Sequence, residues 1–260
     1  MISLADSIVR VHRRRVVLPG PPVQCDVCHY WDTSNPEVQE LMREAGRPLF
    51  EADCRCEERR REEGRAERRR WADSNISHRR DDDVARTFDS FVKRLGLEDA
   101  YAAAQEMAAG QGPTVLTLCG DYATGKSHLV EAIGRAWLHD GGTCRYDFVP
   151  DLANSLLGIV SARRGFDGGA NATTVAAEMD WRASMGLLLL DDLGQWGSEW
   201  VNAQITALVD ERLRTGGRLV VTINLERGQV ADQMDFRLAS RLFDRGARVV
   251  YMKCKAFGEG

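Results

Sequence analysis

Short apolar runs alternate with longer stretches of helical spacing along residues 84–255. Five of the runs are too short for helices and are rich in β-branched or aliphatic residues, which predicts strands. They are residues 114–119, 145–149, 186–192, 218–224 and 247–254. Strands that alternate with helices indicate an α/β fold, in which helices cover both faces of a parallel sheet. We therefore expect a core built on a five-stranded parallel sheet.

The stretches between the predicted strands place apolar residues three and four positions apart, which predicts amphipathic helices. They include residues 126–142, 151–163, 198–217 and 233–246. In the first of these helices the predicted buried positions are Leu129, Val130, Ile133, Ala136 and Trp137. In the third they are Val201, Ile205, Leu208 and Val209. Two of the helices end at glycine pairs, as helices often do.

A glycine-bounded loop joins the first predicted strand to its helix and matches the pattern G-x-x-x-x-G-K-[ST]. Backbone N–H groups in such a loop, together with the positive end of the following helix, favour phosphate. We predict that Lys126 reaches the β- and γ-phosphates of a bound triphosphate and that the Ser127 hydroxyl ligates Mg²⁺. The predicted nucleotide-binding residues are Gly120, Asp121, Tyr122, Ala123, Thr124, Gly125, Lys126, Ser127 and His128. The alternative is a chance match in a turn, against which the strand before and the helix after it argue.

Polar residues end two of the apolar strands. Asp191 and Asp192 close residues 186–192, where the carboxyl edge of a parallel sheet binds ligands. We expect Asp191 to hold Mg²⁺ through water and Asp192 to orient or deprotonate the attacking water. Because aspartate is one methylene shorter than glutamate, hydrolysis should be slow. Asn224 is a candidate contact for the γ-phosphate or the water; the alternatives are a capping role for Asp192 and a turn-forming Asn224.

Arginines recur every four residues near the end of the chain. Arg237, Arg241 and Arg245 form one helical stripe, and Leu238 and Leu242 fall on another face. One interpretation is a solvated stripe, which the composition favours because 31 of the 35 basic residues are arginine. The other is an arginine finger that reaches a nucleotide on a neighbouring subunit.

Four of the seven cysteines lie in the first 56 residues. Cys25, Cys28, Cys54 and Cys56 form two pairs that can close a tetrahedral Zn²⁺ site, with His29 as a possible substitute ligand. The alternative is a set of unrelated reduced thiols. The other three cysteines lie on predicted strands and should be buried thiols. They are Cys119, Cys144 and Cys254.

Composition narrows the class of protein. The formal net charge is −4, so the whole chain is not an obvious polyanion binder. The chain lacks a secretory h-region and any apolar run near the ~20 residues that span a bilayer. We therefore expect a cytoplasmic protein without membrane contact. Residues 55–70 hold eight Arg and five Glu, which predicts a solvated helix with nucleic-acid contact as the alternative. Tyr30, Trp31 and Trp71 could stack on single-stranded bases or, more commonly, pack in an interface or core.

Several stretches together resemble the AAA+ ATPases that load replicative helicases in bacteria and phages, the DnaC/DnaI type. The stretches are GDYATGKSHL (120–129), LLLLDDLG (187–194), VVTIN (220–224), RLASRL (237–242) and residues 72–91. The resemblance implies an ASCE-type core without a separate lid, ATP with Mg²⁺, and self-association in which Arg241 is the finger and Arg237 a helper. It also implies a zinc-binding, helicase-docking module at 1–71, a linker at 72–91 and an ATPase domain at 92–260. The implied partners are the hexameric replicative helicase and single-stranded DNA, although the zinc module could instead touch DNA.

Two other functions stay open at this point. A transposition-helper ATPase resembles the same core, although a zinc module at its start is less expected. A nucleotide-gated adaptor would bind DNA and a partner with little turnover. A metabolic P-loop kinase is disfavoured because no segment reads as a lid or a small-substrate site and the cysteine module would have no use.

Overall fold

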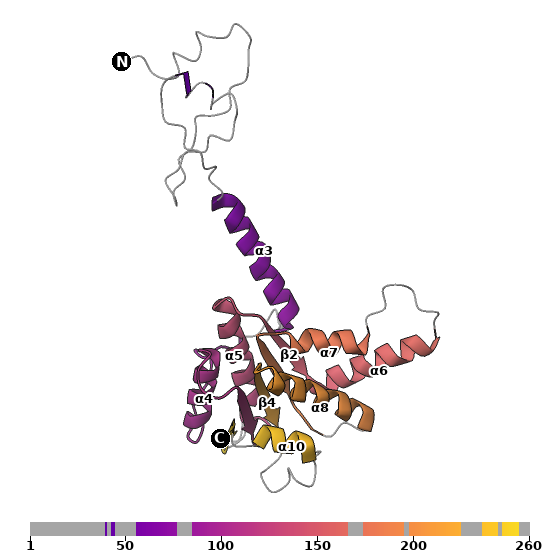
Figure 1. Ribbon diagram of the computed structural model, residues 1–260. Helices are drawn as coiled ribbons and strands as arrows, with labels where there is room; N and C mark the ends of the chain where they lie inside the picture. The colour runs from indigo at the N-terminus through magenta and orange to yellow at the C-terminus, as the bar shows by residue number, and fades with distance from the viewer. Residues whose placement is uncertain are drawn as a thin grey trace. The chain divides into compact units, whose positions relative to one another are not determined.

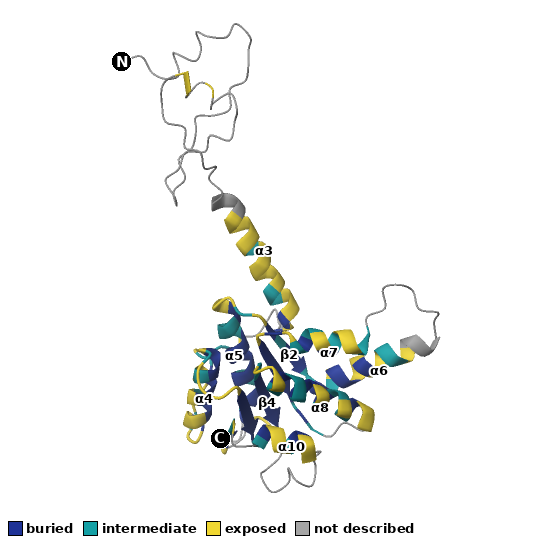
Figure 2. Cartoon of the chain, in the orientation of Figure 1, coloured by how far each residue is buried: buried dark blue, intermediate teal, exposed yellow. Residues whose placement is uncertain are grey.

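The computed structural model describes residues 40, 43–44, 56–76, 85–165, 174–194, 198–224, 236–243 and 246–254. The chain divides into two compact units, residues 1–65 and 66–260. Helix α3 (Cys56–Ser74) confirms the predicted charged helix, and its residues are mostly exposed (Figure 2). Three of the four proposed zinc cysteines, Cys25, Cys28 and Cys54, lie outside the described residues, as do Tyr30 and Trp31.

The second unit is built on a five-stranded parallel sheet with the strand order β2-β3-β4-β1-β5. The strands are β1 (Val115–Cys119), β2 (Cys144–Phe148), β3 (Leu187–Asp191), β4 (Arg218–Ile223) and β5 (Ala247–Tyr251). Five strands were predicted, and five are found among the described residues, each within a few residues of its expected position. The predicted α/β fold class is therefore confirmed.

Helices cover both faces of the sheet (Figure 1). Around the sheet lie α4 (Glu98–Ala108), α5 (Lys126–His139), α6 (Val149–Gly165), α7 (Val175–Ala183), α8 (Glu199–Arg214) and α10 (Phe236–Phe243). One buried cluster packs α4 and α5 against the sheet, and a second packs α6, α7, α8 and α10 against the opposite face. Strand β3 is buried on both faces, which accounts for its run of leucines. Leu187 and Leu189 pack in the first cluster, and Leu188 and Leu190 pack in the second.

Two helices, α4 and α7, were not predicted from the spacing of apolar residues. Helix α4 buries alanines almost alone, and alanine gives little amphipathic signal. Helix α7 is short and begins at the N-cap Thr174, whose hydroxyl accepts a hydrogen bond from the Ala177 N–H at 2.9 Å. Two bounds also differ from expectation. Val149 begins α6 rather than ending a strand, and Cys254 lies beyond the end of β5, half-buried rather than buried.

Cys119 and Cys144 are buried on β1 and β2 as expected. Burial raises the pKa of each thiol to about 12. Trp71 is half-buried against the cluster of α4 and α5, and its ring meets the His139 ring edge-on with centroids 5.3 Å apart. The packing role for Trp71 is therefore the one that the structure supports.

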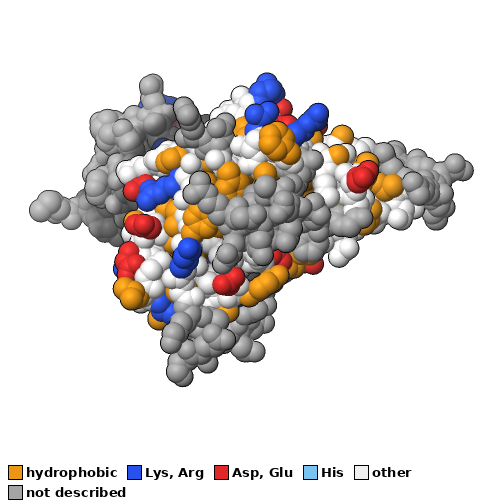
Figure 3. Space-filling model, turned by 90° about the horizontal axis from the view of Figure 1, so that it is seen from below, with side chains coloured by type: hydrophobic (Ala, Val, Ile, Leu, Met, Phe, Trp, Pro, Cys, Tyr) orange, Lys and Arg blue, Asp and Glu red, His pale blue; other side chains and the backbone are white. Residues whose placement is uncertain are grey.

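One face of the described surface is mixed in charge. Seen from below, positive, negative and hydrophobic side chains are interspersed on this face (Figure 3). Among the described residues, no helix combines the length and the hydropathy that crossing a bilayer requires.

Candidate functional site

The loop between β1 and α5 has a backbone that only glycine tolerates at its two ends. Gly120 has φ +147°, and a Cβ at this position would lie 2.5 Å from the Met252 carbonyl oxygen. Gly125 is the N-cap of α5 with φ +100°, in the left-handed region. Because Gly125 has no side chain, it does not cap the first N–H groups of α5. The loop therefore presents backbone donors and a helix N-terminus at one place.

Lys126 is buried beneath this loop, with 6% of the residue exposed. Its Nζ donates to the carbonyl oxygens of Gly120 at 2.7 Å and Asp121 at 2.6 Å. Burial lowers the pKa of the ammonium, and the charges of Asp191 and Asp192 act against that shift. The ammonium thus stays close to two carboxylates while it holds the loop backbone.

Asp191 ends β3 and is held at both of its oxygens. The Tyr146 hydroxyl of β2 donates to Oδ2 at 2.7 Å, and the Thr222 hydroxyl of β4 donates to Oδ1. The residue is 3% exposed. Two donors on one buried carboxylate fix its orientation. Asp191 is therefore held in one orientation near the buried Lys126.

Asp192 follows in a left-handed conformation with φ 60°, which is uncommon for a residue other than glycine. Its N–H donates to the Thr222 hydroxyl oxygen at 2.8 Å, and the Asn224 amide donates to its Oδ1. Burial raises the pKa of the Asp192 carboxyl, the Asp191 charge adds to the rise, and Lys126 opposes it. Asn224, a predicted site residue, thus contacts the carboxylate of Asp192.

A segment before α4 forms a wall of the site that sequence reasoning did not assign. Phe91 is buried against Gly125, and the Arg94 guanidinium donates to the carbonyl oxygen of Thr124 at 3.0 Å. The His128 ring meets the same segment, with Nε2 2.9 Å from the Thr87 carbonyl oxygen. Part of the predicted linker therefore packs directly on the loop and on α5. This wall can be recognised only from contacts between residues that lie some 30 positions apart in the sequence.

These groups surround one cavity of about 600 Å³, a size usual for small-molecule sites. Its lining includes most of the predicted nucleotide-site residues, namely Tyr122, Ala123, Thr124, Gly125, Lys126, Ser127, His128, Asp191, Asp192 and Asn224. It also includes residues that were not predicted, among them Arg86, Ser90, Phe91, Val92, Arg94, Phe148 and Thr222. Gly120 and Asp121 contribute through the carbonyls that hold Lys126.

The α10 arginines lie elsewhere. Leu238 and Leu242 of α10 are buried, and Arg237 and Arg241 are exposed, as the stripe predicts. Arg241 Nε donates to Asp210 of α8 at 2.8 Å, and neither arginine lines the cavity of its own chain. Arg245, the third member of the stripe, lies outside the described residues.

The donor set fits a magnesium nucleotide. Backbone N–H groups and a lysine suit phosphates, while a serine hydroxyl and a carboxylate are the oxygen ligands that Mg²⁺ prefers. Ser127 and Asp191 are the residues that could hold the ion, since both line the cavity. Among the described residues, no group of three or more His, Cys, Asp or Glu side chains is placed to hold a metal ion by itself.

The strand order of the parallel sheet, the glycine-bounded loop and the paired aspartates match a P-loop fold of the AAA+ type. No model of a known protein family matches the sequence. The chromosomal replication initiator protein DnaA of Herminiimonas arsenicoxydans is 30% identical over 173 residues, which cover 64% of this chain and 35% of that protein. The chain thus matches about a third of the length of this relative.

Solved structures agree on the fold. The replication initiator DnaA bound to AMPPCP and single-stranded DNA superposes with a TM-score of 0.56 and 21% identity, covering 66% of this chain and 51% of that one. The DnaC helicase loader gives a TM-score of 0.53 and 20% identity, covering 64% of this chain and 96% of that one. At these identities the likeness shows a shared AAA+ fold.

Proposed function

We propose that this chain binds ATP with Mg²⁺ and hydrolyses it. The observation that carries the proposal is the convergence of Lys126, Asp191 and Asp192 on one cavity beside a glycine-bounded loop. The likeness to a DnaA structure that holds AMPPCP supports the choice of nucleotide. Arg86, Ser90, Phe91, Val92 and Arg94, from the segment before α4, supply the remaining wall, against which the rest of the nucleotide would lie.

The position of each residue in the cavity suggests its role in binding or hydrolysing ATP. Lys126 would exchange its bonds to the loop carbonyls for the β- and γ-phosphate oxygens, and the N–H groups at the start of α5 would hold the β-phosphate. Ser127 and Asp191 would hold Mg²⁺, which supplies charge neutralisation at the reacting phosphate. Asp192 would accept a proton from the attacking water or orient it, and Asn224 would hold the Asp192 carboxylate in place through their hydrogen bond.

The test compares nucleotide affinity and turnover in the wild type, Lys126→Ala and Asp192→Asn. Loss of a charged hydrogen-bond donor should weaken ATP affinity by roughly 10- to 100-fold in Lys126→Ala. Asp192→Asn should bind ATP but lose turnover. Lys93→Ala is the matched control, because Lys93 is exposed and packs over the Tyr101 ring outside the cavity. If Lys126→Ala kept full affinity and turnover, the proposal would be wrong.

We propose further that the ATPase units associate and that Arg241 of one unit completes the site of the next. Both Arg241 and its partner Asp210 are about half-exposed, at 53% and 44%, so their ion pair contributes less than about 1 kcal/mol and is easily exchanged. Arg237, one helical turn away on the same face, would assist. In a mixing experiment, Arg241→Ala subunits should restore turnover to Lys126→Ala subunits, since each supplies the part that the other lacks. No gain on mixing would refute the shared site.

At the level of the cell, we propose a role in DNA replication as a loader of the replicative helicase. The similarity to DnaA and the shared fold with a DnaC helicase loader support this choice over a transposition helper. The proposed partners are the ring helicase and single-stranded DNA. Purified helicase should form a complex whose stability depends on ATP, and absence of a complex with and without ATP would contradict the partner. If the wild type and Asp192→Asn showed the same negligible turnover, an adaptor would replace the enzyme.

The N-terminal part belongs to the same proposal. Residues 1–71 would form the helicase-docking module, with Zn²⁺ held by Cys25, Cys28, Cys54 and Cys56, ahead of a linker at 72–91 and the ATPase domain at 92–260. Metal analysis of the purified chain should give one zinc per chain, and this zinc should be lost in a Cys25→Ser, Cys28→Ser double variant. A chain without zinc in both forms would refute the metal site.

A further inference from the structure

Tyr146 reaches the carboxylate of Asp191 from the neighbouring strand. In the register of β2 and β3, Tyr146 lies opposite Leu189, and Asp191 is two residues further along. Alternate residues of a strand share one face, and a long aromatic side chain can reach a diagonal neighbour. The ring is buried in the cluster beneath α5, with the residue 6% exposed, and its hydroxyl emerges at Oδ2 of Asp191.

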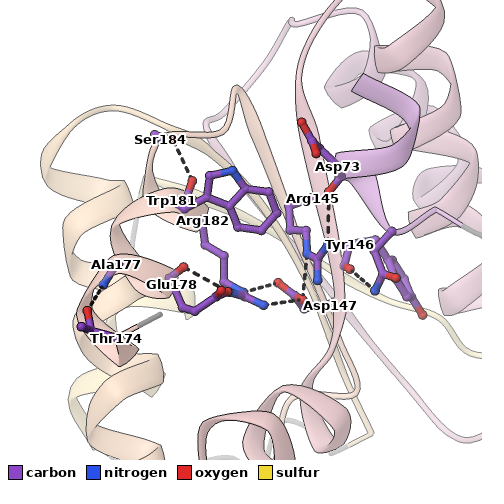
Figure 4. A network of polar contacts seen from close by, with 11 residues as sticks. Asp73, Arg145, Tyr146, Asp147, Thr174, Ala177, Glu178, Trp181, Arg182 and Ser184 are labelled. Atoms are coloured by element: carbon purple, nitrogen blue, oxygen red, sulfur yellow. Dashed lines mark hydrogen bonds and ion pairs between the residues drawn. The ribbon is translucent and has the colours of Figure 1, made fainter. Parts of the chain in front are cut away.

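The strand that carries Tyr146 is fastened to the end of α3. The Asn75 side-chain amide donates to the Tyr146 carbonyl oxygen at 3.0 Å, and the Arg145 guanidinium donates to the Asp73 carbonyl oxygen at 3.1 Å. Figure 4 shows Arg145 between Asp73 and Asp147. Arg145 donates at 3.0 Å to Asp147, which is buried in the same strand. Arg145 thus meets the end of α3 through its side chain, and Tyr146 through its backbone.

Asp147 extends these contacts to α7. The Arg182 guanidinium donates to Asp147 at 2.9 Å, and both side chains are about 5% exposed or less (Figure 4). Their ion pair raises the pKa of Arg182 against the opposing effect of burial. Asp147 also pairs with Arg145, and Arg182 also pairs with Glu178, so each charge of this buried pair is held by two ionic partners. Strand β2 is therefore held from both sides at the residues flanking Tyr146.

The end of α3 is itself set into the core. Ile76 is 2% exposed, and it fills the space above Gly134 of α5, where an added Cβ would lie 2.2 Å from its Cδ1. Asn75 takes a left-handed conformation with φ 55°, the usual end of a helix. Ser74 is fully buried, and its hydroxyl accepts from the Ile76 N–H at 3.1 Å. Residues 73–76 are thus a fixed point rather than a loose connection.

We propose that Tyr146 is a positioning residue for the magnesium carboxylate Asp191, and that the end of α3 at residues 73–76 holds it there. The inference rests on the proposed function of the cavity. Its consequence is that a change at the end of α3, the helix leading from the N-terminal part, alters how strongly the site holds Mg²⁺. The affinity for nucleotide without Mg²⁺ is set by the loop and Lys126 and is not altered.

The test is a Mg²⁺ titration of ATP turnover, together with the affinity for a fluorescent ATP analogue in EDTA, in the full-length chain. Tyr146→Phe removes one hydroxyl and keeps the ring. Loss of one hydrogen bond to a charged group predicts an increase of about tenfold in the Mg²⁺ concentration for half-maximal turnover. Affinity in EDTA should stay within about twofold. Tyr101→Phe is the matched control, since its hydroxyl makes only a long bond of 3.4 Å, to the Phe88 carbonyl.

The outcomes separate the two proposals. If Tyr146→Phe binds nucleotide but has the Mg²⁺ requirement of the wild type, the positioning role is wrong and the proposed function stands. If the wild type neither binds nor hydrolyses ATP, the proposed function fails and takes this inference with it. Should Tyr146→Phe not fold, Thr222→Val removes the other donor to Asp191, and an unchanged Mg²⁺ requirement in that variant overturns the positioning role equally.

The contribution of α3 has its own variant. Asn75→Gly keeps a residue suited to the left-handed conformation and removes the bond to the Tyr146 carbonyl. Loss of a neutral hydrogen bond predicts an increase of about threefold in the Mg²⁺ requirement, smaller than in Tyr146→Phe. An unchanged requirement in Asn75→Gly would remove α3 from the proposal.

Discussion

Arg212 offers a quantitative test of what holds the site-bearing strands together. It lies in the last turn of α8 and is 2% exposed. Its guanidinium donates to the carbonyls of Ala183 at 2.8 Å, Gly186 at 3.1 Å and Arg218 at 2.6 Å, and also to the Met185 carbonyl. Burial lowers the pKa of this arginine. One side chain thus joins the end of α7 to the starts of β3 and β4, the strands that carry Asp191 and Thr222.

Arg212→Met keeps the length of the stem and removes every donor. Each buried carbonyl left without a partner costs about 1–3 kcal/mol, while the variant no longer has to bury a guanidinium, which itself costs several kcal/mol. We expect a net loss of about 3–5 kcal/mol in the free energy of unfolding. For a unit of this size that corresponds to a fall of about 10 °C in Tm.

The assay is thermal and urea unfolding followed by circular dichroism. Arg214→Met is the matched control, because Arg214 is two residues away, is 72% exposed and pairs only with Glu211 in the same helix. The control should melt with the wild type. Arg212→Lys should fall between the two, because one ammonium cannot reach four carbonyls as a planar guanidinium does. If Arg212→Met and Arg214→Met melted together, the carbonyl contacts would not hold the strands.

Three further predictions concern thiols, pH and packing. Cys119 and Cys144 should resist alkylation in the native chain, because burial raises their pKa from 9.0 to about 12 and leaves ~1,000-fold less thiolate; mass spectrometry that found them labelled at mildly alkaline pH as fast as in urea would contradict this. ATP turnover should fall on acidification at a pH above the ordinary aspartate value of about 3.9, because burial and a neighbouring carboxylate raise the pKa of Asp192; a pH–rate profile that is flat down to that value would rule Asp192 out as the base. Gly134→Ala should lower the free energy of unfolding by about 1–3 kcal/mol through overpacking against Ile76 and Leu189, and the double variant with Ile76→Ala should lose less than the sum of the two single losses; strictly additive losses in urea unfolding would show that positions 134 and 76 do not meet.

The sequence predicts the sheet and the loop well because their signals are local. A parallel strand buried on both faces is apolar, as the leucines of β3 are, and the loop has glycine at its two ends, where φ is positive. Helix α4 is missed because its buried face is made of alanines such as Ala103 and Ala104, which do not stand out from a polar background.

The rest of the site could not be predicted because it depends on pairs distant in sequence. Tyr146 and Asp191 are 45 residues apart and meet only because β2 and β3 pair in one register. Arg94 reaches the carbonyl of Thr124 because the segment before α4 folds over the loop. The spacing of apolar residues along one segment predicts neither of these two contacts. The residues proposed for the chemistry can therefore be predicted from the sequence motif, whereas the residues that support them are found only once the fold is known.

The tight fit between Gly134 and Ile76 also has a consequence for how this protein can change over generations. A side chain at position 134 would meet Ile76 and also Leu189, so it costs less stability once position 76 has become smaller, and this favours one order of the two mutations. Related chains that share this contact should show the two positions drifting jointly, with a larger residue at one accompanied by a smaller one at the other. The contact would then be visible as a correlated pair across descendants.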